Sequence, residues 1–394
     1  MSDSRGNRIL YVHNSADLYG ASRSLLRLVP RMKSRGWNVQ VLVPEDGPLK
    51  QRLESFGVKV DIDPALSIIT RTTFKSWRLL LLVAGFVRSV ARLRRRIRAE
   101  RIDLVHTNSG VIFSPALAAR LAGVPHVWHV RESFEEFRSL WKPYSSYMLA
   151  CSRRIIAVSG PTAAQFPASP KVTVVHNGAD LDEFALDSEA ARARFRGEHG
   201  LGNLPVVGCI GRIKFVRKGQ EVLVEAAKRI KDSGFQAKYL IVGSTAPGYE
   251  DHLVRLRELI QRLGLQEDVI LAGELSDVRA AYAAMDIFVL PSAQPEPFGG
   301  VVLEAMALKL PVIATAIGGS IEQVEDGVTG YLIPPADSAA MADRVKRLLE
   351  DPELRVRMGH AGRERLARRF SIGEMLNRIE GVYRDAGLLP ESDP

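Results

Sequence analysis

The stretch MDIFVLPSAQPEPFGGVVLEAMA, residues 285–307, joins a strand, a rigid loop and the start of a helix. The apolar run IFVL is typical of a strand that is covered on both faces. A proline on either side of Glu296 stiffens the loop. Gly299 and Gly300 open the helix, and Glu304 follows about one turn later. One carboxylate therefore stands in a rigid loop and another on a helix, with two glycines between them.

The same strand–loop–helix order recurs along the chain in two series, separated by a polar stretch around residues 182–203. Strands that alternate with helices predict parallel sheets with helices on both faces. We therefore expect an α/β fold of two doubly wound, Rossmann-like domains that face a central cleft. The expected strands are 8–14, 38–44, 58–63, 103–108, 126–130, 154–159 and 171–177, then 204–212, 238–243, 268–273, 286–292, 311–315 and 330–335.

The net charge of +9 is divided unevenly over the 394 residues. Residues 1–180 hold 27 Lys and Arg against 13 Asp and Glu, whereas residues 181–394 hold 27 against 32. The halves therefore carry +14 and −5. Such asymmetry indicates that the first half meets an anionic partner, with nucleic acid, a membrane surface and a phosphorylated substrate as the candidates.

The two cysteines, Cys151 and Cys209, lie far apart, so we expect no disulfide framework and a cytoplasmic protein. The start of the chain shows no signal-peptide pattern. The longest apolar run, residues 79–87, is far shorter than the ~20 residues that a membrane span needs.

Charged groups at strand ends of the second series suit a ligand that carries a diphosphate and paired hydroxyls. Arg212 and Lys218 follow the strand 204–212, where two cations near a helix N-terminus can clamp a diphosphate. Glu304 shares a helix face with Gly300, and a carboxylate there can accept hydrogen bonds from paired ribose hydroxyls. The alternative interpretation is a set of solvated surface charges.

Several motifs in fixed order resemble glycosyltransferase family 4, a family of retaining enzymes with the GT-B fold that includes the group 1 type. The E-x7-E spacing of EPFGGVVLEAMA is followed by KLPVIATAIGGSIEQVEDGVTGYLIPPAD. GRIKFVRKG resembles the phosphate-binding loop, and IIAVSG and VVHNGAD resemble the segments that lead to the second domain. The resemblance covers nearly the whole chain. It implies an acceptor-binding domain at 1–182, a nucleotide-sugar-binding domain at 183–371, and a C-terminal helix at about 372–394 that crosses back to the first domain.

The resemblance assigns donor roles in the second domain. Arg212 and Lys218 would bind the diphosphate and stabilise the leaving group, and Arg217 would share this role because the loop is one residue longer than usual. Glu296 would contact sugar hydroxyls, and Glu304 would hold the ribose. The expected donor-binding residues are Gly20, Arg212, Lys218, Glu274, Glu296, Phe298, Gly299, Gly300 and Glu304, with Glu274 near the nucleobase and residues 298–300 offering backbone N–H groups.

In the first domain, LYGASRSL resembles the family's glycine-rich loop, with Gly20 at the second glycine and Tyr19 in place of the first. HVWHVRES resembles the segment with the active-site histidine, which is here His129. The alternative for a lone histidine is a structural residue. The expected catalytic set is Glu296, His129, Arg212 and Lys218, and the expected acceptor-side residues are His106, Asn108, Arg131 and Glu132.

The implied reaction moves a sugar from a UDP- or GDP-sugar to a hydroxyl of a glycan or lipid-linked glycan in cell-surface polysaccharide synthesis. We expect no cofactor and no metal, and we interpret the DID of residues 61–63 as an incidental match to a metal-binding Asp-x-Asp motif. The alternatives are a nucleotide-sugar epimerase of similar fold and a basic nucleic-acid-binding protein. Nucleic acid is not expected, because the basic residues lack interleaved aromatic residues.

The basic segment WRLLLLVAGFVRSVARLRRRIRAER, residues 77–101, has two interpretations. It could lie on an anionic membrane surface and bring the enzyme to a lipid-linked acceptor at the inner face of the cell membrane. It could equally be an ordinary amphipathic helix that packs on the sheet.

Overall fold

The computed structural model describes residues 7–68, 78–134, 138–184 and 188–388. They form two compact units, one of residues 1–177 with 372–394 and one of residues 178–371. The division thus falls a few residues before the expected boundary at 182. Ala179 already lies in the second unit, where its N–H donates to the carbonyl of Phe370, 3.0 Å away.

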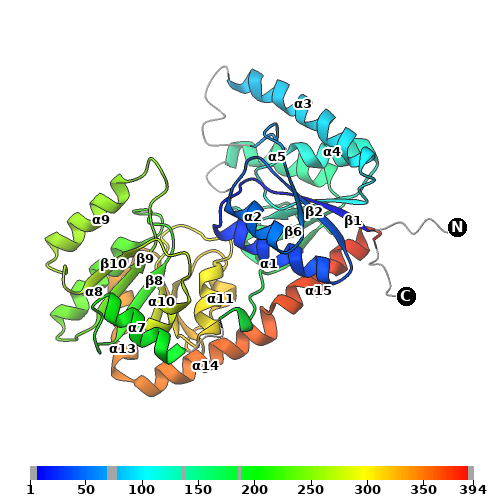
Figure 1. The fold of residues 1–394 in the computed structure, drawn as a ribbon. Helices are drawn as coiled ribbons and strands as arrows, with labels where there is room; N and C mark the ends of the chain where they lie inside the picture. Colours follow the sequence, from blue (N-terminus) through cyan, green and yellow to red (C-terminus); the bar gives the residue numbers. More distant parts are fainter. Residues whose placement is uncertain (1–6, 69–77, 135–137, 185–187, 389–394) are drawn as a thin grey trace. The chain divides into compact units, whose positions relative to one another are not determined.

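The first unit is built on a parallel seven-stranded sheet with the order β3-β2-β1-β4-β5-β6-β7. Figure 1 shows this sheet between layers of helices. The strands are β1 Arg8–Val12, β2 Asn38–Val43, β3 Lys59–Ile62, β4 Leu104–Thr107, β5 His126–Val130, β6 Arg154–Ala157 and β7 Val172–Val174. The helices are α1 Gly20–Ser34, α2 Pro48–Ser55, α3 Arg78–Ala99, α4 Ser114–Ala122, α5 Arg138–Cys151, α6 Gly160–Ala163 and α15 Ile372–Asp385.

Alternation along the strands divides the core of this unit between the two faces of the sheet. In β1, Ile9 and Tyr11 pack with residues of α1, α2 and α15, whereas Leu10 and Val12 pack with residues of α3 and α4. Both faces of the strand are buried, which explains its continuous apolar sequence.

Helix α15 comes from the far end of the chain but belongs to the first unit, where it lies beside α1 (Figure 1). Its Tyr383 is fully buried. The hydroxyl of Tyr383 is 2.8 Å from that of Tyr11 in β1 and 2.7 Å from Nδ1 of His106 in β4. The C-terminal helix is therefore hydrogen-bonded to the centre of the sheet.

The second unit repeats the architecture with a parallel six-stranded sheet in the order β10-β9-β8-β11-β12-β13. Its strands are β8 Val206–Ile210, β9 Lys238–Val242, β10 Val269–Gly273, β11 Ile287–Leu290, β12 Val312–Thr315 and β13 Gly330–Ile333. Its helices are α7 Ser188–Glu198, α8 Gln220–Asp232, α9 Asp251–Arg262, α10 Arg279–Ala284, α11 Gly300–Ala307, α12 Ser320–Gln323, α13 Ser338–Glu350 and α14 Pro352–Arg369, and a 3₁₀ turn covers Asp182–Phe184.

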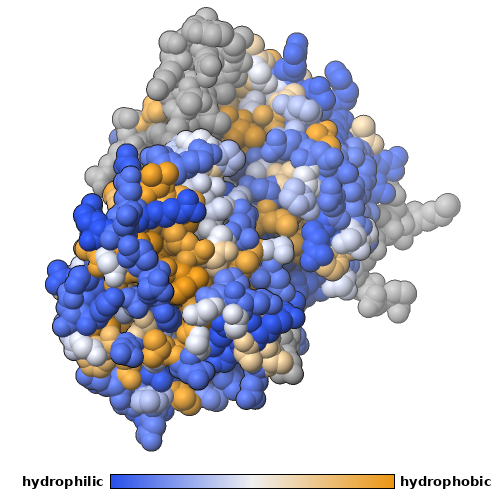
Figure 2. Space-filling view, turned by 60° about the vertical axis from the view of Figure 1, so that its left-hand side comes forward, coloured by the Kyte–Doolittle hydropathy of each residue, from blue (hydrophilic) through white to orange (hydrophobic). Residues whose placement is uncertain are grey.

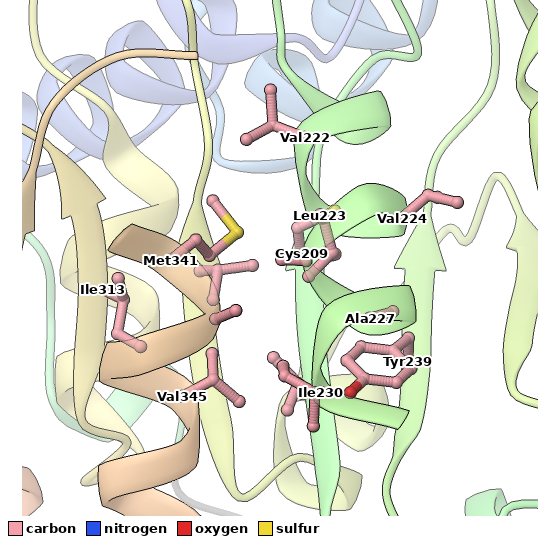
Figure 3. Packing of buried hydrophobic residues seen from close by; sticks show 14 of the residues in the cluster. Cys209, Val222, Leu223, Val224, Ala227, Ile230, Tyr239, Ile313, Met341 and Val345 are labelled. Atoms are coloured by element: carbon pink, nitrogen blue, oxygen red, sulfur yellow. The ribbon is translucent and has the colours of Figure 1, made fainter. Parts of the chain in front are cut away.

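One face of this second sheet carries a large aliphatic core. Figure 3 shows side chains of α8 and α13 pointing toward one another over the strands, among them Leu223, Ile230, Met341 and Val345. All four side chains are fully buried. A core of this kind makes the strand ends rigid supports for the loops that follow them.

Helix α3 holds the basic segment, and its apolar side chains from Val90 onward pack inward. Val90, Leu93 and Ile97 recur at helical spacing and are buried in a cluster with α4. Arg96 forms ion pairs with Asp61 and Glu100. The structure therefore shows the packed amphipathic helix, and the membrane contact stays a prediction.

Within the part of the chain that the structure describes, no helix combines the length and the apolar character needed to cross a membrane. On the face shown in Figure 2, hydrophobic residues form patches among hydrophilic ones.

Candidate active site

The loop after β11 holds Glu296 in a partly buried ion pair with Lys218. Its carboxylate accepts hydrogen bonds from Nζ of Lys218 and from Oγ of Ser292, the latter at 2.8 Å. Burial by itself raises the pKa of this carboxyl, but the charges of Lys218 and Arg217 and the two hydrogen bonds outweigh it, so the pKa lies below its usual value. Glu296 is therefore ionised at neutral pH.

Lys218 reaches Glu296 because the two loops follow neighbouring strands. Strand β8 pairs with β11, so the loop 211–219 and the loop 291–299 leave the same edge of the sheet. The backbone N–H groups of Ala293 and Gln294 both donate to the carbonyl of Arg217, at 3.1 and 3.3 Å. Arg212 and Lys218, predicted as one cationic clamp, thus lie in a loop that is docked onto the Glu296 loop.

Two glycines make this close docking possible. Gly219 has φ of +70°, and a Cβ atom there would overlap the carbonyl of Pro291. Gly318 has φ of +59°, and a Cβ atom there would overlap the backbone of Glu296. A left-handed backbone without a side chain is a role that glycine fills at little cost. Sequence reasoning assigned no role to Gly318, although the Gly-Gly pair after β12 was a signal for it.

Helix α11 places Glu304 in the interior of the unit. The residue is 3% exposed, and the hydroxyl of Tyr282 donates to its Oε2 at 3.1 Å. At the start of the helix, the carbonyl of Gly299 accepts from Nε2 of Gln323 at 2.9 Å, whereas a Cβ atom on Gly300 would meet no atom within 4 Å. The structure thus leaves room beside Gly300 and holds Glu304 one turn further on.

Phe298 and Glu274 complete the predicted donor residues of this unit. The ring of Phe298 is buried against Phe370, with the ring centroids 5.7 Å apart. Its side chain therefore anchors the loop, and the predicted contact of its backbone N–H with the donor stays a prediction. Glu274 follows β10 and accepts a hydrogen bond from Oγ of Ser244, at 2.5 Å, so the loops after β9 and β10 also meet.

In the first unit, the structure brings the predicted histidine and acceptor-side residues together. Nε of Arg131 donates to Oδ1 of Asn108 at 2.9 Å, and its guanidinium also donates to Nδ1 of His129 at 3.3 Å. The rings of His106 and His129 have centroids 5.4 Å apart. Burial, the charge of Arg131 and the neighbouring imidazole hold the pKa of His129 well below its usual value.

Glu132 clamps the backbone that carries this cluster. Its carboxylate accepts from Oγ of Ser109 at 2.5 Å and from the N–H groups of Gly110 and Arg131 at 2.7 and 2.9 Å. Burial raises the pKa of Glu132, against these hydrogen bonds and the charge of Arg131. Glu132 thus joins the loops after β4 and β5.

Gly20 is the first residue of α1, and a Cβ atom there would meet no atom within 4 Å. The turn before it is held by Asp17, whose Oδ1 accepts from the N–H of Tyr19 at 3.0 Å and from Oγ of Ser22 at 2.8 Å. Sequence reasoning missed Asp17 and Ser22. Their polar side chains just after the first strand were the available signal.

Asp61 and Asp63, the Asp-x-Asp match, form ion pairs with Arg96 and Arg92. Among the described residues, no group of three or more His, Cys, Asp and Glu side chains is arranged to hold a metal ion.

Comparison with known proteins identifies the family and agrees with the fold. The family described as "Glycosyl transferases group 1" matches residues 191–365, and "Glycosyltransferase Family 4" matches residues 19–183. An alpha-D-kanosaminyltransferase of Streptomyces kanamyceticus is 30% identical over 391 residues, which is 92% of this chain and 98% of that protein. A GDP-mannose-dependent alpha-(1-6)-phosphatidylinositol monomannoside mannosyltransferase of Mycolicibacterium smegmatis is 34% identical over 53% of each chain.

Among solved structures, Anabaena Alr3699/HepE in complex with UDP-glucose has a TM-score of 0.82 at 25% identity, over 96% of this chain and 99% of that one. A glycosyltransferase of Rickettsia africae has a TM-score of 0.81 at 23% identity, which supports the shared fold. One conclusion follows from the two parallel-sheet units, from the order of the loops at the strand ends and from these matches across both units. The chain belongs to glycosyltransferase family 4 and is a nucleotide-sugar-dependent glycosyltransferase of the GT-B type.

Proposed function

We propose that the protein transfers a sugar, with retention of the anomeric configuration, from a UDP- or GDP-sugar to a hydroxyl of a glycan or lipid-linked glycan. Cell-surface polysaccharide synthesis is the proposed setting. The names of the similar proteins support both nucleotides, since HepE was solved with UDP-glucose and the mycobacterial relative depends on GDP-mannose. A similar protein of Staphylococcus aureus is a capsular polysaccharide biosynthesis glycosyltransferase.

The observation that carries the proposal is the contact between Lys218 and Glu296. In this interpretation Lys218 and Arg212 bind the donor diphosphate, and the carboxylate of Glu296 accepts hydrogen bonds from the sugar. When the diphosphate arrives, Lys218 exchanges one anionic partner for another, so its charge stays compensated throughout.

The other donor contacts follow from the same loop and helix. The N–H groups at the start of α11 attract phosphate, because they are unpaired within the helix and lie at its positive end. Glu304, one turn further, accepts from the ribose hydroxyls, and Glu274 lies on the loop proposed for the nucleobase.

In the chemical step, the bond between the sugar C1 and the diphosphate oxygen breaks, and a bond from C1 to the acceptor oxygen forms on the same face. The proton of the acceptor hydroxyl passes to the departing diphosphate. Arg212, Lys218 and the N-terminus of α11 stabilise the negative charge on that group. We propose that no metal ion is needed, and activity that is unchanged by EDTA would support this.

We place the acceptor-binding surface on the first unit. The residues proposed to contact the acceptor or to support those contacts are His106, Asn108, Arg131 and Glu132, and Gly20 is proposed to contact the donor.

The proposed site is cytoplasmic, with a peripheral contact of α3 at the inner face of the membrane. Arg88 and Arg95 are exposed on α3. The Arg88→Gln/Arg95→Gln variant should sediment less with anionic liposomes than the wild type, and equal sedimentation would contradict this contact.

A donor screen tests the proposal as a whole. Purified protein is mixed with UDP- and GDP-sugars, and binding is read as a thermal shift. The matching donor is then incubated with and without glycan acceptors. Release of nucleoside diphosphate that requires an acceptor supports transfer, whereas an epimerised donor formed without an acceptor would identify an epimerase instead.

A further inference from the structure

The protonation of His129 follows from its contact with Arg131. A guanidinium has five N–H donors and no acceptor. Because Arg131 donates to Nδ1 of His129, at 3.3 Å, this ring nitrogen must accept and therefore carries no proton. Burial lowers the pKa of Arg131 to about 10, so the guanidinium remains charged at neutral pH. A neutral imidazole with a bare Nδ1 carries its proton on Nε2.

A chain of hydrogen bonds supports Arg131 in this position. Nε of Arg131 donates to Oδ1 of Asn108. Nδ1 of His13 lies 3.2 Å from the amide nitrogen of Asn108 and 3.3 Å from its backbone carbonyl oxygen. Nε2 of His13 lies 3.0 Å from Oγ of Ser22, and Ser22 donates to the carboxylate of Asp17 at 2.8 Å. The side chains that support Arg131 therefore reach from the end of β5 to the turn before α1.

A second arm ties the guanidinium to the end of the sheet. Arg131 also donates to Oδ1 of Asn177, which accepts in addition from Oγ of Ser24 at 2.9 Å. Nε and both terminal nitrogens of Arg131 donate to three different residues, Asn108, Asn177 and His129. These three hydrogen bonds define the plane of the guanidinium. Reorienting it would break three hydrogen bonds in a buried region.

Nε2 of His129 is buried and has no hydrogen-bond partner among the described residues. A buried N–H donor without an acceptor is costly, so a ligand oxygen that accepts from it is bound more strongly. The ionisable groups that face His129 are Arg131 and His106, and both disfavour a positive charge on its ring. His129 therefore stays neutral when the pH falls moderately below 7.

We propose that Arg131 is a positioning residue that holds His129 as the neutral Nε2–H tautomer, so that His129 hydrogen-bonds an oxygen of the reactants and does not move a proton. The inference rests on the proposed glycosyl transfer, in which the acceptor proton leaves with the diphosphate and no protein base is needed. The position of His129 alone is compatible with two roles, hydrogen-bond donor and base. The tautomer of the ring distinguishes them.

The first arm of the test is ¹⁵N NMR of protein labelled in its eight histidines, with the His129 signals assigned by comparison with the His129→Gln variant. We expect a bare Nδ1 and a protonated Nε2 that do not titrate between about pH 5 and pH 8. In the Arg131→Met variant this preference should be lost. A proton on Nδ1 of the wild type, or titration of His129 in this range, would overturn the proposal.

The second arm compares side chains at position 129. Gln places an amide N–H near the position of Nε2 but cannot act as a base, Glu offers no donor when ionised, and Ala offers neither. We expect His129→Gln to keep most of the turnover, with an unchanged pH profile, and His129→Glu and His129→Ala to lose about 100-fold. A Gln variant as inactive as the Ala variant would show that proton transfer is required and would overturn the donor role.

A matched control lies on the same strand. His126 is equally buried, but both its ring nitrogens have partners, Thr107 at 2.8 Å and Ser152 at 3.0 Å. His126→Gln measures how much stability the protein loses when a buried imidazole is replaced. Its thermal midpoint is the reference against which the midpoints of the His129 variants are compared. If the wild type transfers no sugar from any donor, the proposed function fails and the donor role with it, while the NMR spectrum still reports the tautomer.

Discussion

At the scale of single residues, burial and neighbouring groups act in opposite directions on the pKa of Glu296. Removal from water favours the neutral acid, whereas Lys218, Ser292 and Arg217 favour the carboxylate, and the second group of effects prevails. Glu304 lies deeper, at 3% exposed, and accepts a hydrogen bond from the hydroxyl of Tyr282. The two carboxylates of the E-x7-E motif thus differ in environment, in line with the separate roles proposed for them.

The two carboxylates should respond differently to the same substitution. Glu304→Gln should weaken binding of the free nucleoside diphosphate by about 10-fold, because a carboxylate–hydroxyl hydrogen bond is worth about 1.5–3 kcal/mol. Glu296→Gln should leave this affinity within about 3-fold and lower kcat by at least about 100-fold. Calorimetry and steady-state kinetics measure the two effects, and equal effects of both variants on nucleotide affinity would contradict the assignment.

At the scale of elements, the N-terminus of α11 combines space with a positive helix end. Apart from its chain neighbours and the nearby backbone of α11, no atom lies within 4 Å of a Cβ atom placed on Gly300, so packing does not require glycine there. Alanine is also the better helix former, by about 1 kcal/mol. A requirement for glycine at this position would therefore come from the ligand.

Gly300→Ala should accordingly keep or raise the thermal midpoint and weaken donor binding by at least about 10-fold, because the added methyl group occupies space that the phosphate needs. Gly219→Ala is the contrasting control, since it should lower the midpoint through overlap with Pro291. Full donor affinity in Gly300→Ala would show that the donor lies elsewhere.

Helix α15 offers a prediction about stability. Tyr383→Phe leaves both Tyr11 and His106 without the hydroxyl that they contact, so we expect a loss of about 1–3 kcal/mol in the free energy of unfolding. Tyr11→Phe removes one of these hydrogen bonds and keeps the other, so its loss should be smaller. Urea unfolding measures both, and a larger loss for Tyr11→Phe would contradict this arrangement.

At the scale of the whole molecule, the first unit contains four buried histidines whose pKa values are lowered. Burial lowers the pKa of His13 to about 4 and that of His126 to about 3, and the pKa values of His106 and His129 lie well below their usual value. The folded protein therefore keeps these rings neutral at a pH where the unfolded chain, with a histidine pKa of about 6.5, already binds protons.

Since the unfolded state binds more protons, stability is fully present above about pH 6.5 and falls as the pH is lowered toward 4. Each histidine contributes up to about 1.4 kcal/mol per pH unit in this window. Thermal midpoints at pH 7.5 and pH 5.5 should thus differ by several degrees, and by less in the His126→Gln variant. The same midpoint at both values would contradict burial of neutral rings.

Much of the fold could be predicted from local pattern. The strand expected at 126–130 is β5 to the residue, and the others lie inside their expected ranges, shortened at the ends. Strand ends were the weak point because the last residues leave the sheet to form the loops, as Arg212 does after β8. The strand order was not predicted, since chain order does not specify that β1 lies between β2 and β4.

The sequence by itself determined the alternation of strands and helices, the family, and which residue types follow which strands. Tertiary structure alone decided the partners: Lys218 with Glu296, 78 positions apart, and Tyr11 with Tyr383, 372 positions apart. It also decided that Arg131 contacts His129 and Asn177 at once. The physical reason is that hydrogen bonds and ion pairs act over a few ångströms, whereas sheet order and helix packing determine which strand ends approach that closely.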